Sequence, residues 1–225
     1  MGHSVRRHLG IQIRTYDETI RRFIPRYEAM LEVAAREAVR GRPASVLDLG
    51  AGTGALSEAI LEACDNAALE LIDVDPEMLA RARSRLRRFA GRVSYTQLSF
   101  LGPLPPCGAV AASLAFHHVR TIEAKRALYQ RIHEALEPGG TFVNADAALS
   151  ADPAEREATF RKWVDHMVSQ GIEEQRAWEN LAQWGEEDTY FPLEEELSAL
   201  TAAGFRAGCV WRHGPIAVIV GRKPD

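Results

Sequence analysis

A glycine-rich turn and one aspartate are the residues whose spacing points most clearly to chemistry. The turn, Asp48-Leu49-Gly50-Ala51-Gly52-Thr53-Gly54, follows a short apolar run and precedes a helical pattern. Glycines at alternate positions let a ligand approach the backbone N–H groups at the start of that helix. Asp73 ends the next apolar run, where a carboxylate can bind ribose hydroxyls. We expect a nucleotide-like cofactor here, the alternative being a plain glycine turn near a surface aspartate.

The charges around this turn favour S-adenosylmethionine over a dinucleotide. Gly50, Gly52 and Ala55 fit a dinucleotide fingerprint, but Asp48 at the preceding strand end would repel a pyrophosphate. The same carboxylate can pair with an ammonium group, directly or through water. S-adenosylmethionine is a zwitterion that carries a ribose and a cationic sulfur, so we predict it as the cofactor. An NAD-dependent reductase is a distant alternative.

Two adjacent histidines, His117 and His118, are the candidate catalytic residues. They follow the fourth apolar run, and histidine has the unperturbed pKa nearest neutrality, so one of the two is suited to take a proton from an acceptor. The alternative is a structural pair that caps the next helix or fills space. His166, beside Asp165, is a weaker candidate base, because a solvated helix position explains it as well.

Alternating strand and helix patterns place these residues at one edge of a predicted sheet. Strand-like runs cover 45–49, 69–73, 93–98, 109–115 and 141–145. The segments between them have the length and pattern of helices, and Asp75-Pro76 is a typical helix start. This order predicts a Rossmann-like α/β fold, with a parallel sheet and helices on both faces.

Further helices flank this predicted core. The pattern over 16–39 is helical, and Pro25 should kink the helix or start a second one. Residues 147–192 contain two helical patterns and three of the four tryptophans, Trp163, Trp178 and Trp184. We expect this insert to lie over the acceptor as a lid, although aromatic residues that only pack two helices would give the same pattern.

The chain closes with a predicted helix over 193–203 and two strand-like runs, 205–211 and 216–220. The link between the two runs is too short for a parallel crossover, so we expect an antiparallel hairpin. Five arginines also crowd one predicted helix: Arg81, Arg83, Arg85, Arg87 and Arg88. We expect a solvated helix face there, with an RNA-binding patch as the alternative.

Composition excludes several classes of protein. The chain has 27 Lys and Arg against 31 Asp and Glu, a net charge of −4, which gives no global attraction for nucleic acid or an anionic membrane. No apolar run is long enough for a membrane span, and the first residues lack a signal-peptide core. Three cysteines without a C-x-x-C pair argue against disulfides and a zinc site. We expect a cytoplasmic protein with a small-molecule partner and no metal, and leave a homodimer open.

Four motifs in order resemble the class I S-adenosylmethionine-dependent methyltransferases. Besides the glycine turn, they are the segment 71–79, Phe116-His117-His118-Val119 and Leu136-Glu137-Pro138-Gly139-Gly140. The resemblance runs from about Tyr16 to Lys223 and implies seven strands, the last antiparallel between the fifth and sixth. It implies one domain over 1–225, made of an N-terminal helical lid (12–40), a core (44–146), the insert (147–192) and a C-terminal helix and hairpin (193–223).

The same resemblance implies which residues hold the cofactor. Gly50, Ala51 and Gly52 would line its methionine end, with Asp48 nearby, and Asp73 would hold the ribose. The other expected contacts are Tyr16 in the lid, Val74 and Met78 beside the adenine, Ser99 and Phe100 at its far edge, and Ser113 and Leu114 below the methyl group. The family usually has an acid where Ser99 stands, so a hydroxyl or backbone group would have to replace it.

Both ends of the chain are similar to a narrower branch that includes the carboxy-S-adenosylmethionine synthases. The similarity lies in Tyr16-Asp17, the segment 24–27, Trp211 and the segment 217–223. We predict an enzyme that transfers a methyl group to a small molecule by in-line displacement. A carboxy-S-adenosylmethionine synthase-like enzyme is the alternative, and would need a cationic residue such as Arg14 or Arg22 near the sulfur. A non-catalytic adenosylmethionine-binding protein is the other alternative.

Overall fold

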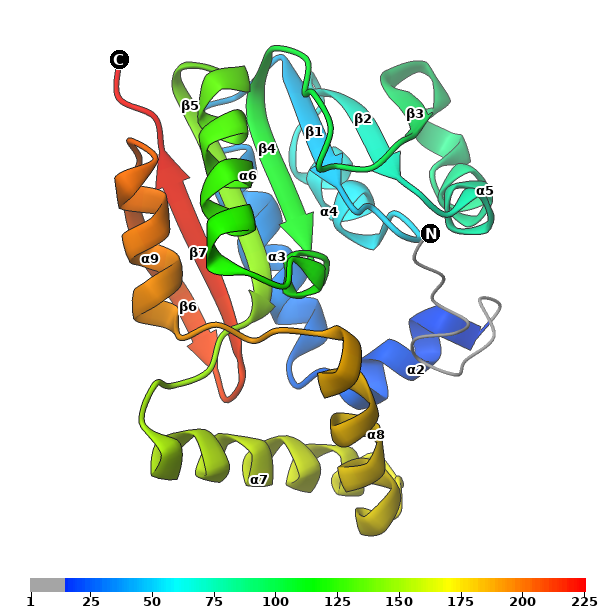
Figure 1. Cartoon of the computed structure of the whole chain (residues 1–225). Coiled ribbons are helices and arrows are strands. Elements are labelled where there is room, and N and C mark those ends of the chain that lie inside the picture. Colours follow the sequence, from blue (N-terminus) through cyan, green and yellow to red (C-terminus); the bar gives the residue numbers. More distant parts are fainter. Residues whose placement is uncertain (1–14) are drawn as a thin grey trace.

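The computed structural model describes residues 15–225, in which seven strands form one sheet in the order β3-β2-β1-β4-β5-β7-β6 (Figure 1). The first five strands are parallel, while β7 runs antiparallel to both β5 and β6. The predicted Rossmann-like sheet with an antiparallel last strand is therefore confirmed. The strands are β1 (Ser45–Leu49), β2 (Ala68–Asp73), β3 (Val93–Gln97), β4 (Cys107–Ser113), β5 (Leu136–Ala147), β6 (Arg206–His213) and β7 (Ile216–Arg222).

Helices cover both faces of the sheet, as the alternating pattern predicted. Helices α6 (Ile122–Ala135) and α9 (Leu193–Ala202) lie in front of it in Figure 1, and α3 (Tyr27–Ala38) and α4 (Ala55–Ala63) lie behind. Each face has its own apolar core, and alternate residues of β5 enter opposite cores: Val143 packs in one, Phe142 in the other. Burial on both faces explains why the central strands β1 and β4 are nearly continuous apolar runs.

Three helices lie beyond the edge of the sheet at which β4 ends (Figure 1). They are α2 (Tyr16–Phe23) and the two helices of the insert, α7 (Pro153–Ser169) and α8 (Glu174–Glu187). The chain breaks between α2 and α3 at Pro25, as predicted, and Arg26 turns it with a φ of 57°. The Trp163 indole of α7 donates a hydrogen bond of 2.7 Å to the Phe23 carbonyl of α2, so the two distant segments form one layer.

Several predicted boundaries differ from the structure by up to three residues, and two differ by more. The fifth strand begins at Leu136, not near Thr141, because Leu136 already pairs with Cys107 of β4. The register then shifts across the Pro138-Gly139-Gly140 segment, so that the next pair is Ala109 with Thr141. Helix α5 (Pro76–Arg85) ends before Phe89, and a 3-10 segment, η2 (Arg87–Arg92), follows it. Glycine, proline and a local change of helix type are features that hydrophobic periodicity does not reveal.

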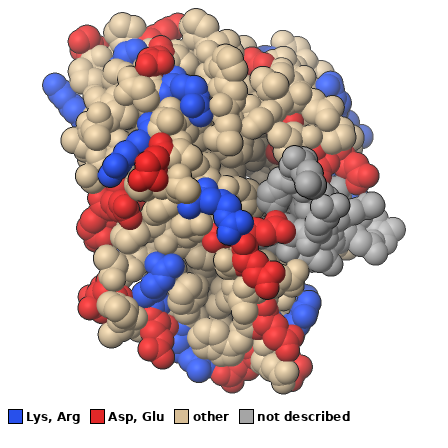
Figure 2. Space-filling model, in the orientation of Figure 1, with Lys and Arg blue, Asp and Glu red and all other residues tan. Residues whose placement is uncertain are grey.

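Two observations bear on the membrane and nucleic-acid predictions: the character of the described helices, and the charges on one face of the molecule. None of their helices has both the length and the apolar character that a bilayer crossing requires. On the face drawn in Figure 2, acidic and basic side chains are interspersed.

Candidate active site

A cavity of about 540 Å³ lies at the carboxyl edge of the sheet, within the size range of small-molecule sites. The sheet forms its floor, and residues of α2, α7 and α8 form its outer wall. Of the catalytic and cofactor-binding residues predicted from the sequence, all except Asp48 and His166 lie on its lining. The lining includes Tyr16, Gly50, Ala51, Gly52, Asp73, Val74, Met78, Ser99, Phe100, Ser113, Leu114, His117 and His118. His166 on α7 is not on the lining.

The glycine turn and Asp73 form one hydrogen-bonded unit. The Gly52 N–H donates to Asp73 Oδ2 at 2.8 Å, and the Asp75 N–H donates to Asp73 Oδ1 at the same distance. Gly50 adopts a φ of +69°, and a Cβ there would lie 2.5 Å from the Cβ of Ala115, so only glycine fits. A Cβ on Gly52 would meet nothing within 4 Å, which leaves the backbone open to a ligand.

Asp48 lies below this turn, in the protein interior. Its side chain is fully buried, and Oδ2 accepts a 2.6 Å hydrogen bond from the Ser57 hydroxyl of α4. Oδ1 has no hydrogen-bond partner among the described residues. Burial, opposed by the Ser57 hydroxyl, raises the pKa of Asp48 to about 7. A positive ligand group above the turn would therefore favour the charged form of this carboxyl.

His117 is held by Asp146, a residue that the sequence analysis did not select. His117 lies in the 3-10 segment η3 (Phe116–His118) after β4, and Asp146 lies at the end of β5. His117 Nδ1 is 2.6 Å from Asp146 Oδ1. Asp146 also accepts the backbone N–H groups of Phe116 and His117 on Oδ2 and of Ala147 on Oδ1. This carboxylate therefore fixes both the turn and the imidazole ring that it carries.

The two groups shift each other's pKa. Burial alone would lower the pKa of His117, but the charge of Asp146 and the hydrogen bond to it outweigh burial and raise the pKa above its usual value. Burial would raise the pKa of Asp146, and the charge and hydrogen bond of His117 lower it instead. With Nδ1 engaged by Asp146, the neutral ring presents a lone pair on Nε2.

A second carboxylate reaches the same corner from the insert. Asp188 follows α8, and its side chain is 4% exposed. Its Oδ1 is 3.0 Å from His118 Nδ1 and 3.9 Å from His117 Nε2, and Oδ2 accepts a 2.9 Å hydrogen bond from the Tyr190 hydroxyl. The Thr189 N–H donates to the His117 carbonyl at 2.8 Å, which joins the end of the insert to the turn after β4.

Aromatic side chains wall this part of the cavity. Trp163 of α7 lies 6.1 Å from Trp184 of α8 and 5.7 Å from Tyr190, measured between ring centroids. Phe23 of α2 lies 4.9 Å from Trp184. All four rings line the cavity, so the insert tryptophans at 163 and 184 face the space as well as packing two helices together. Trp178 is partly buried against the apolar core outside that lining.

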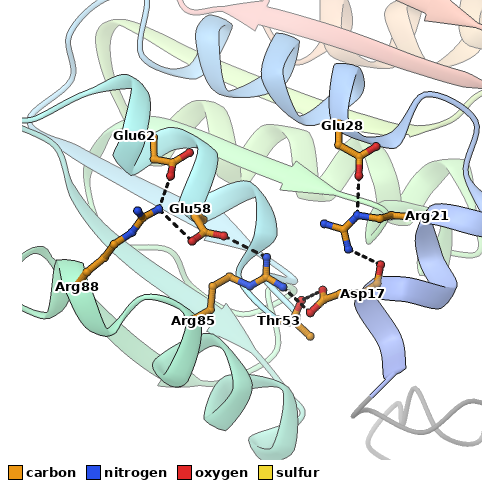
Figure 3. A network of polar contacts seen from close by, with 8 residues as sticks. All are labelled: Asp17, Arg21, Glu28, Thr53, Glu58, Glu62, Arg85 and Arg88. Carbon is orange, nitrogen blue, oxygen red and sulfur yellow. Dashed lines mark hydrogen bonds and ion pairs between the residues drawn. The ribbon is translucent and has the colours of Figure 1, made fainter.

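Helix α2 is tied to the glycine turn by polar contacts, shown in Figure 3. The Thr53 hydroxyl of the turn donates to Asp17 Oδ1 at 2.7 Å, and Arg85 of α5 forms an ion pair with the other Asp17 oxygen. Arg85 also pairs with Glu58 of α4 at 3.3 Å. Its side chain is only 18% exposed, so the predicted solvated face is wrong for Arg85. The sequence pattern could not show this, because the partner Asp17 belongs to a distant segment.

Tyr16 of α2 and Leu114 after β4 both line the cavity. Burial, with the neighbouring Tyr27 and Asp17, raises the pKa of Tyr16, so its hydroxyl stays protonated at neutral pH. Leu114, directly after β4, has a φ of 50°, a conformation that costs a residue with a Cβ of order 1–3 kcal/mol. The backbone at the end of β4 is thus held in a strained turn on the cavity lining, close in sequence to His117 and His118.

Comparisons with known proteins agree with this geometry. Residues 46–140 match a family model described as "Methyltransferase domain". An uncharacterized methyltransferase of Geobacillus kaustophilus (strain HTA426) is 30% identical over 196 residues, which cover 85% of this chain and 81% of that protein. The chain belongs to the class I S-adenosylmethionine-dependent methyltransferases. The methyltransferase is also similar to a carboxy-S-adenosyl-L-methionine synthase of Nautilia profundicola, at 22% identity over 198 residues, 85% of this chain and 82% of that protein.

Solved structures support the fold of the methyltransferase. An O-methyltransferase family protein from Burkholderia thailandensis superposes with a TM-score of 0.69 at 17% identity. The match covers 88% of this chain and 56% of the Burkholderia protein, so this chain spans little more than half the length of that protein. S-adenosylmethionine is the methyl donor of the family, and the open backbone at Gly52 and the unpartnered Asp48 oxygen suit a zwitterionic ligand of this kind.

Three residues that complete the histidine corner of this methyltransferase were not predicted from the sequence: Asp146, Asp188 and Tyr190. Asp146 could have been found, because it directly follows the predicted strand 141–145 at the ligand-binding edge. Asp188 and Tyr190 carried no such signal, since they lie in an irregular loop of the insert. Among the described residues no Lys or Arg lines the cavity; Arg22 is exposed and donates to the Gln170 carbonyl, and Arg14 lies outside the described residues.

Proposed function

We propose that the enzyme methylates a nucleophilic atom of a small molecule, with His117 as the proton acceptor and Asp146 as its positioning residue. The observation that carries this proposal is that the glycine turn with Asp73 and the His117–Asp146 pair line the same cavity. When bound, S-adenosylmethionine supplies a methyl group on a positively charged sulfur, and transfer needs an aligned nucleophile in a dry site.

The residues of the chain divide this work between them. In the proposal, Asp73 accepts hydrogen bonds from the ribose, and Gly50, Ala51 and Gly52 bring the backbone close to the methionine end. Val74, Met78, Ser99 and Phe100 surround the adenine, and Tyr16 covers the site from α2. Ser113 and Leu114 support the methyl group from below. His117 Nε2 takes a proton from the acceptor, while the rings of Trp163, Trp184 and Tyr190 exclude water.

Asp48 has an indirect place in this scheme. It is absent from the lining, so we propose that it acts on the donor's ammonium group through water or through the backbone of the turn. His118, in contact with Asp188, is proposed to order the acceptor side and not to act as the base. The two roles differ because Asp146 binds Nδ1 of His117, which leaves Nε2 of that ring able to accept a proton from the acceptor. The His118 ring is instead held by Asp188 of the insert.

A carboxy-S-adenosylmethionine synthase-like reaction is the second candidate, because four of the relatives that match most of this chain carry that name. It requires a cation to hold the extra carboxylate, and the described lining contains neither Lys nor Arg. Mass spectrometry of the bound nucleoside, after incubation with S-adenosylmethionine and a small carboxylic acid co-substrate, separates the two. An added carboxyl group on the recovered nucleoside would contradict simple methyl transfer.

The test of the donor site is calorimetry with S-adenosylmethionine, and with NAD as the competing ligand. Replacing Asp73 by Ala should weaken S-adenosylmethionine binding by about 1–3 kcal/mol, because ribose hydrogen bonds are lost. Asp65→Ala, an exposed aspartate in the loop before β2, is the matched control. Thermal unfolding of both variants checks that the turn persists. Unchanged affinity in Asp73→Ala, or preferential NAD binding, would contradict the proposal.

We further propose one domain over 1–225 and a cytoplasmic location. The three free thiols, Cys64, Cys107 and Cys209, suit a reducing compartment, and the net charge of −4 does not favour nucleic acid as a partner. The N-terminal lid is proposed over 12–40, of which the structure describes residues 15–40. Sedimentation analysis would decide between monomer and homodimer.

A further inference from the structure

We propose that the acceptor carries a basic nitrogen, an amine on a small apolar or aromatic body, and that Asp188 is the residue that selects it. This rests on the proposed function, since it concerns the acceptor end of the same cavity. Three observations carry it: the signs of the charges on the lining, the position of Asp188 relative to His117, and the aromatic walls around both.

The ionic groups on the described lining are acidic or imidazole. Asp73 and Asp75 lie at the cofactor end, and Asp146 and Asp188 lie at the acceptor end, with no described Lys or Arg among them. An acceptor that carries a carboxylate or phosphate would enter this field with an unfavourable charge. An acceptor with a positively charged nitrogen would be attracted by these carboxylates, and an acceptor with a neutral nitrogen would not be repelled by them.

The position of Asp188 fits the donor pattern of an amine. Its Oδ1 stands 3.9 Å from His117 Nε2, and the Tyr190 hydroxyl holds Oδ2 from behind. Two acceptors at that separation can both be reached from one nitrogen at about 2.9 Å each. An amine has two or three N–H donors for these two atoms, whereas an alcohol has a single O–H. Asp188 would therefore align the nitrogen against the base.

The walls of the same corner suit a cationic group on an apolar body. Trp163, Trp184 and Tyr190 line the acceptor end, and aromatic faces attract ammonium groups more strongly when water is excluded. Phe23 completes this wall from α2. The flat ring faces also provide stacking area for an aromatic acceptor.

The reaction balances for such an acceptor. The ammonium form first gives one proton to His117 Nε2, which leaves a neutral amine with a lone pair. A nitrogen–carbon bond then forms as the carbon–sulfur bond breaks, the bonding pair stays on sulfur, and the positive charge passes from sulfur to the methylated nitrogen. His117 returns the proton to solvent, and no other reactant is needed.

A divalent metal ion is the rival occupant of this corner. Ligand-type atoms of His117, His118 and Asp188 lie within 4.8 Å of one another. An ion there would have to break the contact between His118 Nδ1 and Asp188 Oδ1, whereas an ammonium group can add to it. The surrounding aromatic rings supply no further metal ligands. We therefore assign the corner to an amine and make the metal an outcome of the test.

The first experiment measures binding to the unmodified chain saturated with S-adenosylhomocysteine. Three probes share one ring and differ in their polar group: phenethylamine, 2-phenylethanol and 3-phenylpropanoate, each titrated by calorimetry or by tryptophan fluorescence. We expect phenethylamine to bind at least about tenfold more tightly than 3-phenylpropanoate, with the alcohol between them. Equal or tighter binding of the carboxylate, or no binding by any probe, would overturn the proposal.

The second experiment repeats the series with Asp188→Asn, which keeps the size of the side chain and an acceptor for Tyr190. The preference for phenethylamine should fall by about tenfold, while affinity for S-adenosylhomocysteine stays unchanged. Asp165→Asn, an exposed aspartate on α7, makes the same change of charge away from the cavity and should alter neither. An undiminished preference in Asp188→Asn would overturn the role of that residue.

Two further measurements distinguish an amine from a metal ion as the occupant of this corner. Titration with Zn²⁺ in place of the amine, and repetition of the amine series after treatment with a chelator, test the metal. Stoichiometric Zn²⁺ binding to the unmodified chain that Asp188→Asn abolishes would overturn the amine assignment. Failure to bind S-adenosylhomocysteine at all would instead contradict the proposed function, so the two failures are distinguishable.

Discussion

The two ends of the cavity are built in different ways. The proposed cofactor end comes mainly from one short stretch of chain: the turn after β1, Asp73 at the end of β2 and the start of α5. Hydrogen bonds from the backbone N–H groups of Gly52 and Asp75 to the Asp73 carboxylate join these parts. The acceptor end is assembled from η3, the end of β5 and the insert, joined by side-chain contacts between His117, Asp146 and Asp188.

This difference indicates where specificity can change without loss of the fold. Asp73 fixes the Gly52 amide, so the cofactor end and the local backbone depend on each other. Asp188 and Trp184 belong to the insert, outside the sheet, and can vary while the strands keep their register. The cofactor end should therefore respond to substitution through affinity and stability, and the acceptor end through turnover.

The largest expected effect is on turnover and comes from a substitution at the acceptor end. His117→Gln should lower kcat by about 10²- to 10⁴-fold, because the proton acceptor is lost, while S-adenosylmethionine binding stays unchanged. The measurement is S-adenosylhomocysteine release with an amine acceptor, beside calorimetry with the donor. His166→Gln on α7, a histidine outside the cavity lining, is the control. A kcat close to that of the unmodified enzyme would remove His117 as the base.

A somewhat smaller effect is expected from Asp146→Asn, about a hundredfold in kcat. His117 acts only when it is neutral, and its pKa lies above 6.5, so kcat/KM should rise with pH through that raised pKa. The groups acting on it are Asp146 and Asp188, which raise the pKa, and Lys125, which lowers it. Loss of the Asp146 charge should move the acidic limb of the profile to lower pH. A lower kcat with an unmoved limb would indicate only a structural role.

Much of the cofactor end could be predicted from the sequence, because its signals are local. The glycine turn, Asp73 and the helix start at Asp75-Pro76 lie within one strand–helix–strand unit, and all three stand where the pattern placed them. The strand order followed from the family resemblance and the short hairpin link, and the structure confirms it.

The acceptor end could not be predicted in the same way. The sequence predicted His117 and His118 as candidate catalytic residues. It did not predict the carboxylates that contact them, because Asp146 and Asp188 approach these histidines only after folding. Arg85 shows the same limit, since helical spacing places it on a surface and only tertiary contact with Asp17 explains its burial. Side-chain pairs between distant segments leave no periodic signal in a single sequence.

A third prediction concerns the stability of the cofactor end and compares Asp48→Asn with the unmodified chain, both without ligand. The raised folded pKa of about 7 means that the stability contributed by protonated Asp48 is fully present below its ordinary pKa of 3.8 and is lost as pH rises through 7. Between pH 5.5 and 8 this amounts to about 2 kcal/mol. Asp48→Asn should remove that decline.

The measurement for Asp48 is chemical denaturation at both pH values, read as the difference in the free energy of unfolding. Asp65→Asn, an exposed aspartate, should show the same pH dependence as the unmodified chain. An identical decline in Asp48→Asn would mean that Asp48 is ionised in the folded protein at pH 5.5. The cofactor end would then already hold a charge before the donor binds.

The smallest expected effect tests the tie between the N-terminal helix and the cofactor end. Arg85→Gln removes the ion pair with Asp17 that, together with the Thr53 hydroxyl, holds α2 over the turn. A partly exposed pair is worth about 1 kcal/mol or less, so S-adenosylmethionine should dissociate about two- to fivefold faster. Arg88→Gln is the matched control, because Arg88 pairs with Glu58 and Glu62 and does not reach Asp17 in the contacts of Figure 3. Stopped-flow dissociation and hydrogen exchange over 16–23 report on the tie directly: faster exchange with an unchanged dissociation rate would mean that α2 covers the cavity without controlling release of the donor.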